Sequence, residues 1–219
     1  MSKKIYNIGV IGVGVWGCHS LERELLNTGR CAIKSVCGND SFGAGQNENA
    51  VAAAQDYARE FDAKDVESPE EIFNDPEIDI VSVMTAPAFK PEYLIKALEN
   101  NKYAVTDKPL GMSVAEVEAV CEAENKSQAH GFMLCGYHTR PSAAKLIGMI
   151  QAGEFGEIKA VSVRLNFTGG IYPGFKPTKR WRGEIPGGES VTIGSHALLT
   201  AIKLAGTPVA DSFCLRKNN

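Results

Sequence analysis

Three glycines, Gly12, Gly14 and Gly17, stand between a short apolar run and a segment with the apolar spacing of a helix. In a strand–turn–helix setting, the first glycine permits a tight turn, the second lets the backbone approach a pyrophosphate, and the third lets the helix pack closely on the strand. Backbone N–H groups at the helix start then face the anion. The pattern predicts a dinucleotide-binding turn whose contacts are Gly12, Gly14, Val15, Trp16 and Gly17.

The same stretch shares some features with a secretory signal peptide. Lys3 and Lys4 form a basic start, and an apolar run follows them. The glycines interrupt that run, however, and Trp16 fits a signal peptide poorly. Gly29 stands where a left-handed residue would end the helix, which supports the strand–turn–helix unit. We therefore favour nucleotide binding.

The charge balance and the cysteine spacing argue against several classes of partner. The net charge is −3, and acidic and basic residues are mixed along the chain, so no basic stripe is expected to attract nucleic acid or a membrane surface. The six cysteines include no C-x-x-C pair and no Cys/His spacing typical of zinc, so no metal site is expected. They are typical of reduced thiols in a cytoplasmic protein.

Strand and helix patterns alternate through residue 138. Strands are expected at residues 8–13, 32–37, 78–84, 103–106 and 132–135, with helices between them. The third of these is apolar nearly throughout, as a strand covered on both faces is. The alternation predicts an α/β fold with a doubly wound parallel sheet, in a nucleotide-binding domain at residues 1–138.

The pattern changes in the remaining chain. Residues 158–167 alternate apolar and polar side chains, which is typical of an antiparallel strand with one covered face. Helices are expected at residues 141–153 and 194–204, and a last strand at 209–215. These elements predict a C-terminal α+β domain at residues 139–219 with a largely antiparallel, open sheet. Two strands make no self-sufficient sheet, so either the chain is truncated or another subunit completes the layer.

Several motifs occur in the order found in a known enzyme family. They are residues 12–17, Thr85-Ala86-Pro87, residues 106–110, Gly187-Gly188 and Gly194-Ser195-His196. In these motifs the chain resembles the Gfo/Idh/MocA oxidoreductases, which include glucose-fructose oxidoreductase and inositol dehydrogenase. The resemblance implies an N-terminal Rossmann domain and NAD(P)-dependent chemistry on a hydroxyl or carbonyl carbon of a sugar, cyclitol or related molecule. It also implies a homo-oligomer that associates through the C-terminal sheet.

Lys108 is the first candidate catalytic residue. Hydride transfer from an alcohol needs a base for the hydroxyl proton, and the reverse reaction needs an acid. Lys108 follows the carboxyl end of a parallel strand, where open α/β sheets bind ligands. Its amine can hydrogen-bond the reacting oxygen, and a nearby positive nicotinamide favours its neutral form. The alternative is a surface lysine balanced by Asp107; the resemblance implies catalysis by Lys108 and places both residues at the cofactor.

His196 is the second candidate. It stands near the start of a predicted helix, where the positive end of the helix dipole favours a neutral imidazole that can accept a proton. The alternative is a satisfied capping or core histidine. The resemblance implies that His196 acts as base and acid beside Lys108.

Further contacts come from the resemblance and from departures from the family pattern. Gly38 and Asn39 stand where a carboxylate would bind the ribose of NAD, which favours NADP slightly, although no Arg or Lys follows in the loop. The resemblance adds cofactor contacts at Thr85, Ala86, Trp181 and Arg182, and substrate contacts at Lys108, Tyr137, Thr192 and His196.

Two function classes follow from these residues. Lys108 and His196 favour an NAD(P)-dependent oxidoreductase acting on CH–OH groups. Thr192 stands where many active members carry aspartate, and a threonine supplies no carboxylate to the substrate. Lys90 stands where the family often shows a histidine. Thr192 and the short second domain favour the alternative, a nicotinamide-nucleotide-binding regulator or an inactive, truncated form.

Overall fold

The computed structural model describes residues 4–13, 21–38, 47–135, 139–164 and 194–206. The chain divides into two compact units, Met1–Leu134 and Cys135–Asn219, and each is described by itself. Within the described ranges, no helix combines the length and the apolar character that crossing a lipid bilayer requires.

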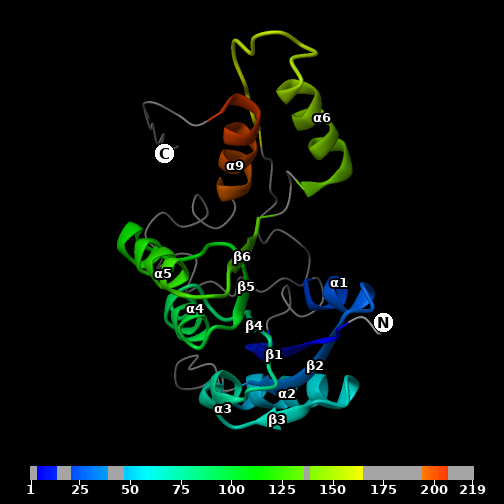
Figure 1. Ribbon diagram of the computed structural model, residues 1–219, viewed down its shortest axis with the longest axis vertical. Coiled ribbons are helices and arrows are strands. Elements are labelled where there is room, and N and C mark those ends of the chain that lie inside the picture. The colour runs from blue at the N-terminus through cyan, green and yellow to red at the C-terminus, as the bar shows by residue number, and fades with distance from the viewer. Residues whose placement is uncertain (1–3, 14–20, 39–46, 136–138, 165–193, 207–219) are drawn as a thin grey trace, which may run out of the picture. The chain divides into compact units, whose positions relative to one another are not determined.

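The first unit is built on a six-stranded sheet (Figure 1). Its strands lie in the spatial order β3-β2-β1-β4-β5-β6, and every neighbouring pair is parallel. This is the Rossmann order, in which the direction of winding reverses between β1 and β4. It confirms the predicted doubly wound sheet. The strands are β1 (Tyr6–Ile11), β2 (Cys31–Cys37), β3 (Lys64–Val66), β4 (Ile80–Val83), β5 (Tyr103–Asp107) and β6 (Gly131–Leu134).

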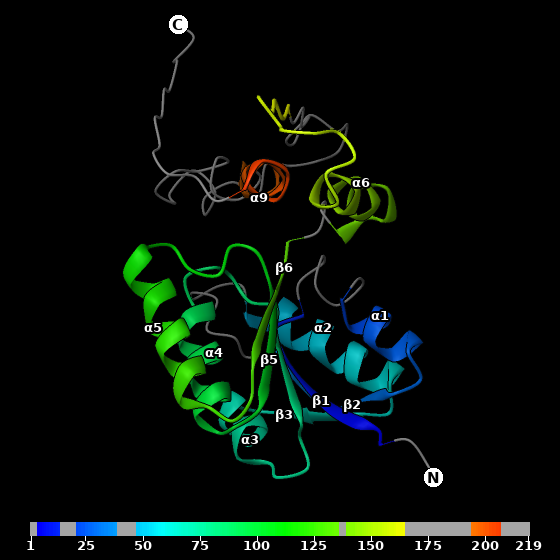
Figure 2. The same ribbon diagram turned by 45° about the horizontal axis from the view of Figure 1, so that its top comes forward.

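Helices cover both faces of this sheet (Figure 2). One face carries α1 (Leu21–Asn27) and α2 (Asn47–Glu60). The other face carries α3 (Pro69–Asn74), α4 (Lys90–Glu99) and α5 (Val114–Lys126). Successive strand residues point to opposite faces, so β1 and β2 each contribute to two hydrophobic cores.

The two cores explain why the central strands are apolar on both faces. Ile8 and Val10 of β1 pack toward α1 and α2, whereas Ile11 packs toward α3, α4 and α5. From α4, Leu94 and Leu98 are 2% and 0% exposed. Burying one such leucine stabilises the fold by about 1.5–3 kcal/mol. The cores therefore anchor the helices whose first turns reach the carboxyl edge of the sheet.

One strand of the sheet is missing from the sequence-based prediction. In β3, Lys64 and Asp65 are exposed and only Val66 is buried. A three-residue strand at the end of a sheet, with two charged residues, carries no alternating apolar signal. Its position is set instead by pairing with β2.

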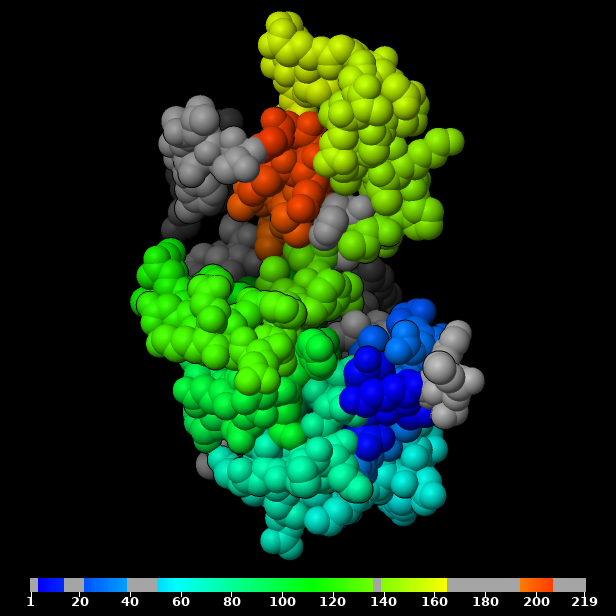
Figure 3. Space-filling model, in the orientation of Figure 1, coloured from blue at the N-terminus to red at the C-terminus, as the bar shows by residue number. Residues whose placement is uncertain are grey.

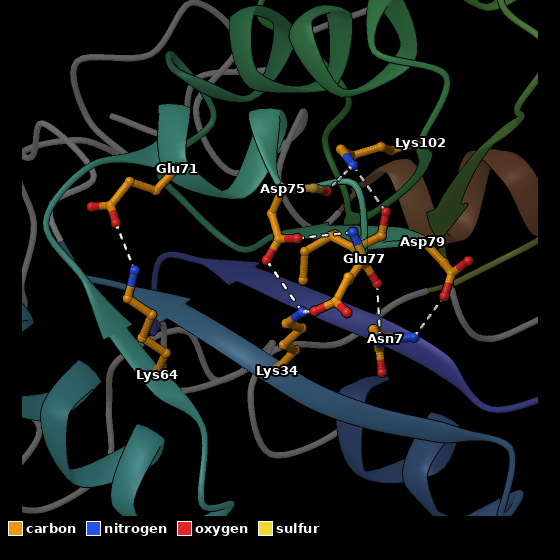
Figure 4. Close-up of polar contacts among 9 residues, drawn as sticks. Asn7, Lys34, Lys64, Glu71, Asp75, Glu77, Asp79 and Lys102 are labelled. Carbon is orange, nitrogen blue, oxygen red and sulfur yellow. Dashed lines mark hydrogen bonds and ion pairs between the residues drawn. The ribbon is translucent and has the colours of Figure 1, made fainter.

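Polar contacts join the amino ends of the strands, which form the edge of the sheet shown in Figure 4. Asp79, just before β4, accepts the backbone N–H of Asn7 at 2.9 Å and the Lys4 ammonium at 2.7 Å. Figure 3 shows the first described residues, in dark blue, at the surface beside turquoise residues. Burial raises the pKa of the Asp79 carboxyl, but the hydrogen bonds from Lys4 and Asn7 outweigh burial and leave the pKa lowered.

Lys102 lies at the same edge, just before β5, and is only 6% exposed. Its Nζ donates to the carbonyl oxygens of Asp75 and Ile78 at 2.6 and 2.9 Å (Figure 4). Burial lowers the pKa of Lys102, while the charges of Asp75 and Asp79 act in the opposite direction. The amino edge therefore holds its charges in mutual contacts.

The second unit contains α6 (Pro141–Gln151) and α9 (Gly194–Ala205), which contact each other. Both helices were expected from the sequence. The described part of the predicted strand, residues 158–164, contains no strand. An antiparallel strand needs a partner, and its sequence alone does not supply one. The rest of that prediction, residues 165–167 and 209–215, lies outside the described residues.

Candidate active site

Most of the predicted site residues that the structure describes in the first unit follow the ends of parallel strands. Gly12 comes after β1, Gly38 after β2, and Thr85 and Ala86 after β4, while Asp107 ends β5. The carboxyl ends of parallel strands meet at one edge of a sheet, and this edge binds ligands in open α/β folds. The described glycines and the Asp107-Lys108 pair therefore belong to one edge.

Gly12 is required to be glycine at this edge. Its φ is +81°, a left-handed conformation, and its N–H donates to Cys37 O at 2.9 Å. A Cβ added there would lie 2.9 Å from Cγ2 of Thr85 and 3.0 Å from the carbonyl carbon and oxygen of Met84. Both the backbone angle and the close contacts exclude a side chain. The chain thus leaves β1 in the tight turn that the glycine pattern predicts.

Buried threonines lie at the ends of β4 and β5, and one of them links the two strands. Thr106 is 1% exposed, and its Oγ1 donates to Val83 O at 2.7 Å. Thr85 is 6% exposed and lies against the turn at Gly12. These contacts fix the backbone directly before Lys108.

Lys90, the first residue of α4, is a buried charge that sequence reasoning noted only as a departure from the family pattern. It is 1% exposed. Its Nζ pairs with Oδ1 of Asp107, donates to Asp107 O at 2.9 Å, and lies 3.5 Å from Lys108 O. The carboxylate of Asp107 is therefore engaged by Lys90, which speaks against the alternative in which Asp107 serves to balance Lys108.

The electrostatics of Lys90 reflect this position. Burial lowers the pKa of Lys90, the Asp107 charge and hydrogen bond raise it, and the positive charge of Lys108 lowers it. Burial prevails, so the pKa lies below its ordinary value. Because the charge of Lys108 lowers the pKa of Lys90, the positive charges of the two lysines repel each other.

Lys108 begins a segment that is fixed at its far end as well. Lys108 is half-buried, and its peptide bond to Pro109 is cis. Five residues later, Ser113 caps α5: its side chain accepts the N–H of Glu116 at 3.2 Å, and the Glu116 carboxylate accepts the N–H groups of Ser113 and Met112. This reciprocal capping box holds the segment between β5 and α5 at the helix end.

Glu22 is a second buried charge that the sequence analysis did not identify. It lies in the first turn of α1 and is 0% exposed, and its Oε1 accepts the hydroxyl of Ser82 from β4. A buried acidic residue in a helix that also carries Arg23 and Glu24 gives no local signal of its partner, which is 60 residues away in the sequence. This contact ties the helix after the glycine turn to the centre of the sheet.

In the second unit, His196 is the third residue of α9, as the sequence predicts. Its Nδ1 lies 3.6 Å from Sγ of Cys135, and its carbonyl accepts the hydroxyl of Thr200 at 2.7 Å. Nδ1 thus faces a thiol within this unit. Lys108 belongs to the other unit, so the structure describes the two candidate catalytic residues separately.

The remaining predicted site residues lie outside the described part of the chain. Within the described ranges, no group of three or more His, Cys, Asp and Glu side chains could hold a metal ion. The residues outside are Gly14, Val15, Trp16, Gly17, Asn39, Tyr137, Trp181, Arg182 and Thr192.

Comparison with known sequences gives relatives that include inositol dehydrogenases. Inositol 2-dehydrogenase of Salmonella paratyphi B is 28% identical over 151 residues, which make up 68% of this chain and 42% of that protein. The scyllo-inositol 2-dehydrogenase (NAD(+)) of Bacillus subtilis is 31% identical over 153 residues, 68% of this chain and 41% of that protein. The aligned part therefore corresponds to less than half of each relative.

A solved structure and a family model cover the sheet itself. The WlbA dehydrogenase from Bordetella pertussis, solved with NADH and UDP-GlcNAcA, is 19% identical with a TM-score of 0.77, over 94% of this chain and 57% of that chain. At this identity the likeness concerns the fold. The model of the Gfo/Idh/MocA oxidoreductase family, with its NAD-binding Rossmann fold, matches residues 6–134, from the first residue of β1 to the last of β6. The chain therefore belongs to the Gfo/Idh/MocA oxidoreductase family.

Proposed function

We propose that this chain is an NAD(P)-dependent oxidoreductase that acts on the hydroxyl or carbonyl carbon of a sugar, cyclitol or related molecule. The observation that carries the proposal is the carboxyl edge of the sheet, where the Gly12 turn and Lys108 occur together. Two relatives are named inositol dehydrogenases, which supports a polyol substrate.

The residues at this edge fit a dinucleotide. The turn at Gly12 has room for no Cβ, which is the kind of backbone that approaches a pyrophosphate closely. Gly38 is buried directly after β2, where the adenosine ribose would bind. Thr85, Ala86 and Asp107 would supply further contacts with the cofactor. A bound nicotinamide would accept or supply the hydride. The Gly38-Asn39 pair, which lacks a carboxylate, favours NADP over NAD.

The chain's own residues would handle the proton and the substrate oxygen. Lys108 would hydrogen-bond the reacting oxygen, and His196 would accept the hydroxyl proton in oxidation and return it in reduction. The thiol of Cys135 lies 3.6 Å from Nδ1 of His196, and Nε2 would be the nitrogen that contacts the substrate. Thr192 and Tyr137 would bind substrate hydroxyls, and Trp181 and Arg182 would border the cofactor.

We also infer a division of the chain into two domains. We place the nucleotide-binding domain at residues 1–138 and a C-terminal domain with an open, largely antiparallel sheet at residues 139–219. That sheet would associate with a second copy of the chain. Size-exclusion chromatography with light scattering tests this association: a dimer or larger oligomer is expected, and a compact monomer would contradict it.

Cofactor titration followed by a substrate screen tests the function. NAD(H) and NADP(H) are added while the fluorescence of Trp16 and Trp181 is followed, and polyols are then screened with the cofactor that binds. We expect saturable binding and turnover of at least one cyclitol or sugar. Folded protein that binds neither cofactor would overturn the proposal.

A second candidate is a nicotinamide-nucleotide-binding regulator. Thr192, in place of the aspartate common in active members, favours it. Such a protein would bind the cofactor but turn over no polyol. The same screen therefore separates the two candidates.

A further inference from the structure

Lys90 has an arrangement that is unusual for a lysine. Fully buried lysines are rare because their charge must be paired and hydrogen-bonded. Lys90 is 1% exposed, and its contacts with described residues converge on the end of β5: the carboxylate and carbonyl oxygens of Asp107, and the carbonyl oxygen of Lys108. A charge placed in this way acts on the segment that carries Lys108.

We propose that Lys90 is a positioning residue for Lys108: it fixes the backbone at residues 107–108 and withholds from the Lys108 amine the carboxylate that precedes it in the chain. The proposal rests on the proposed function, in which the Lys108 amine contacts the substrate oxygen. The new element is Lys90, whose charge and contacts favour the neutral form of the Lys108 amine.

The electrostatic part of the argument follows from opposite charges at short range. A carboxylate within about 4–6 Å of an ammonium group favours the charged form. A lysine amine accepts a hydrogen bond from a substrate hydroxyl only in its neutral form, and a second cation nearby favours that form. Lys90 does both: it engages Asp107, and its own charge acts on Lys108, because the interaction that lowers the pKa of Lys90 is mutual.

The other charged groups near Lys90 are engaged elsewhere. Glu92, on the same helix, pairs with Lys96 at 3.3 Å. Glu116, in the first turn of α5, accepts the N–H groups of Met112 and Ser113. Asp107 and Lys108 are the charges that act on Lys90.

The test measures the reactivity of Lys108 without turnover. The intact protein is labelled with trace acetic anhydride between pH 6 and 11, and the acetylation of Lys108 is quantified by peptide mass spectrometry. In Lys90→Met, Asp107 loses its partner and acts on Lys108, so labelling at pH 8 should fall by about 10-fold, which corresponds to about one pKa unit. Lys90→Arg keeps the charge and should restore labelling.

Two further variants keep the test decisive. Lys102→Met removes the buried lysine of the opposite edge and should leave Lys108 labelling unchanged. Asp107→Asn keeps the charge of Lys90 without its counter-ion and should increase labelling of Lys108, which provides the test if Lys90→Met does not fold. Labelling that stays at the parent level in both Lys90→Met and Asp107→Asn would overturn the proposal.

The outcome is separable from the proposed function. If the parent protein turns over no substrate, the labelling profile still reports on Lys90 and Lys108. If it does turn over a polyol, the pH profile of kcat/KM for oxidation should shift to higher pH in Lys90→Met. A loss of stability without a change in labelling would show a purely structural role and would contradict the proposal.

Discussion

The two edges of the parallel sheet use a buried lysine in different ways. At the amino edge, Lys102 donates to backbone carbonyls among acidic residues that are themselves paired. At the carboxyl edge, Lys90 engages the residue next to the candidate catalytic lysine. At the amino edge, the charged residues contact one another. The carboxyl edge carries the Gly12 turn, which has no room for a side chain, and the half-buried Lys108. The comparison teaches that burial alone does not distinguish a structural charge from a functional one; the neighbours do.

The largest expected effect belongs to Lys108. Lys108→Ala removes the amine that would contact the substrate oxygen, so turnover should fall by about 10²–10⁴-fold. The dissociation constant of the cofactor, followed by tryptophan fluorescence, should change little. Lys102→Met is the matched control, since it removes a lysine from the opposite edge. Equal losses of turnover in both variants would contradict the functional difference between the two edges.

Gly12→Ala should have the second-largest effect. A left-handed φ costs an alanine about 1–2 kcal/mol, and the added Cβ would also press on Met84 and Thr85. We expect a larger loss of unfolding free energy than for Gly29→Ala, together with loss of nucleotide binding. Gly29 also has a positive φ, +64°, but nothing lies within 4 Å of its added Cβ. Gly29→Ala therefore measures the free-energy cost of the backbone conformation alone. Urea unfolding and cofactor titration measure both effects.

Lys102→Met should cost stability without affecting binding. It removes the donor to Asp75 O and Ile78 O, and leaving buried carbonyls unsatisfied costs about 1–3 kcal/mol. The folded state lowers the pKa of Lys102, so the unfolded chain binds more protons as the pH approaches the ordinary value of 10.5. The advantage of the parent over Lys102→Met should therefore grow with rising pH. A weakened cofactor affinity in this variant would contradict a purely structural role.

Asp79→Asn should have the smallest effect. Lys4 is largely exposed, so its pair with Asp79 contributes little to stability, and less at high salt. The folded state lowers the Asp79 pKa, so this stability is present above the ordinary value of 3.8 and is lost as the pH falls through the folded value. Chemical unfolding of parent and variant should differ at pH 7 and converge in acid. A difference that persists in acid would assign the effect to packing.

Features set by local pattern could be predicted from the sequence. The glycine turn, the apolar central strands and the start of α9 at Gly194 each depend on neighbouring residues, and the structure confirms them where it describes them. The strand β3 could not be predicted, because Val66 is its sole buried residue and its place depends on pairing with β2.

The site was predictable only where strand ends mark it. The place of Asp107 and Lys108 at the carboxyl edge could be predicted, because Asp107 ends β5 and Lys108 follows it. The role of Lys90 does not, since its partner lies 17 residues away and only the fold brings the two together. The contact between Glu22 and Ser82 spans 60 residues and has the same origin. The contribution of His196 to the site remains a prediction.

The segment from Lys108 to Ser113 is short, and both of its ends are held by hydrogen bonds. Lys90 and Thr106 hold its beginning, and the Glu116 carboxylate holds its end. A ligand that displaces Lys108 must therefore either stretch the segment or pull on the first turn of α5. The rate of amide hydrogen exchange in the first turn of α5 should therefore change when a ligand contacts Lys108.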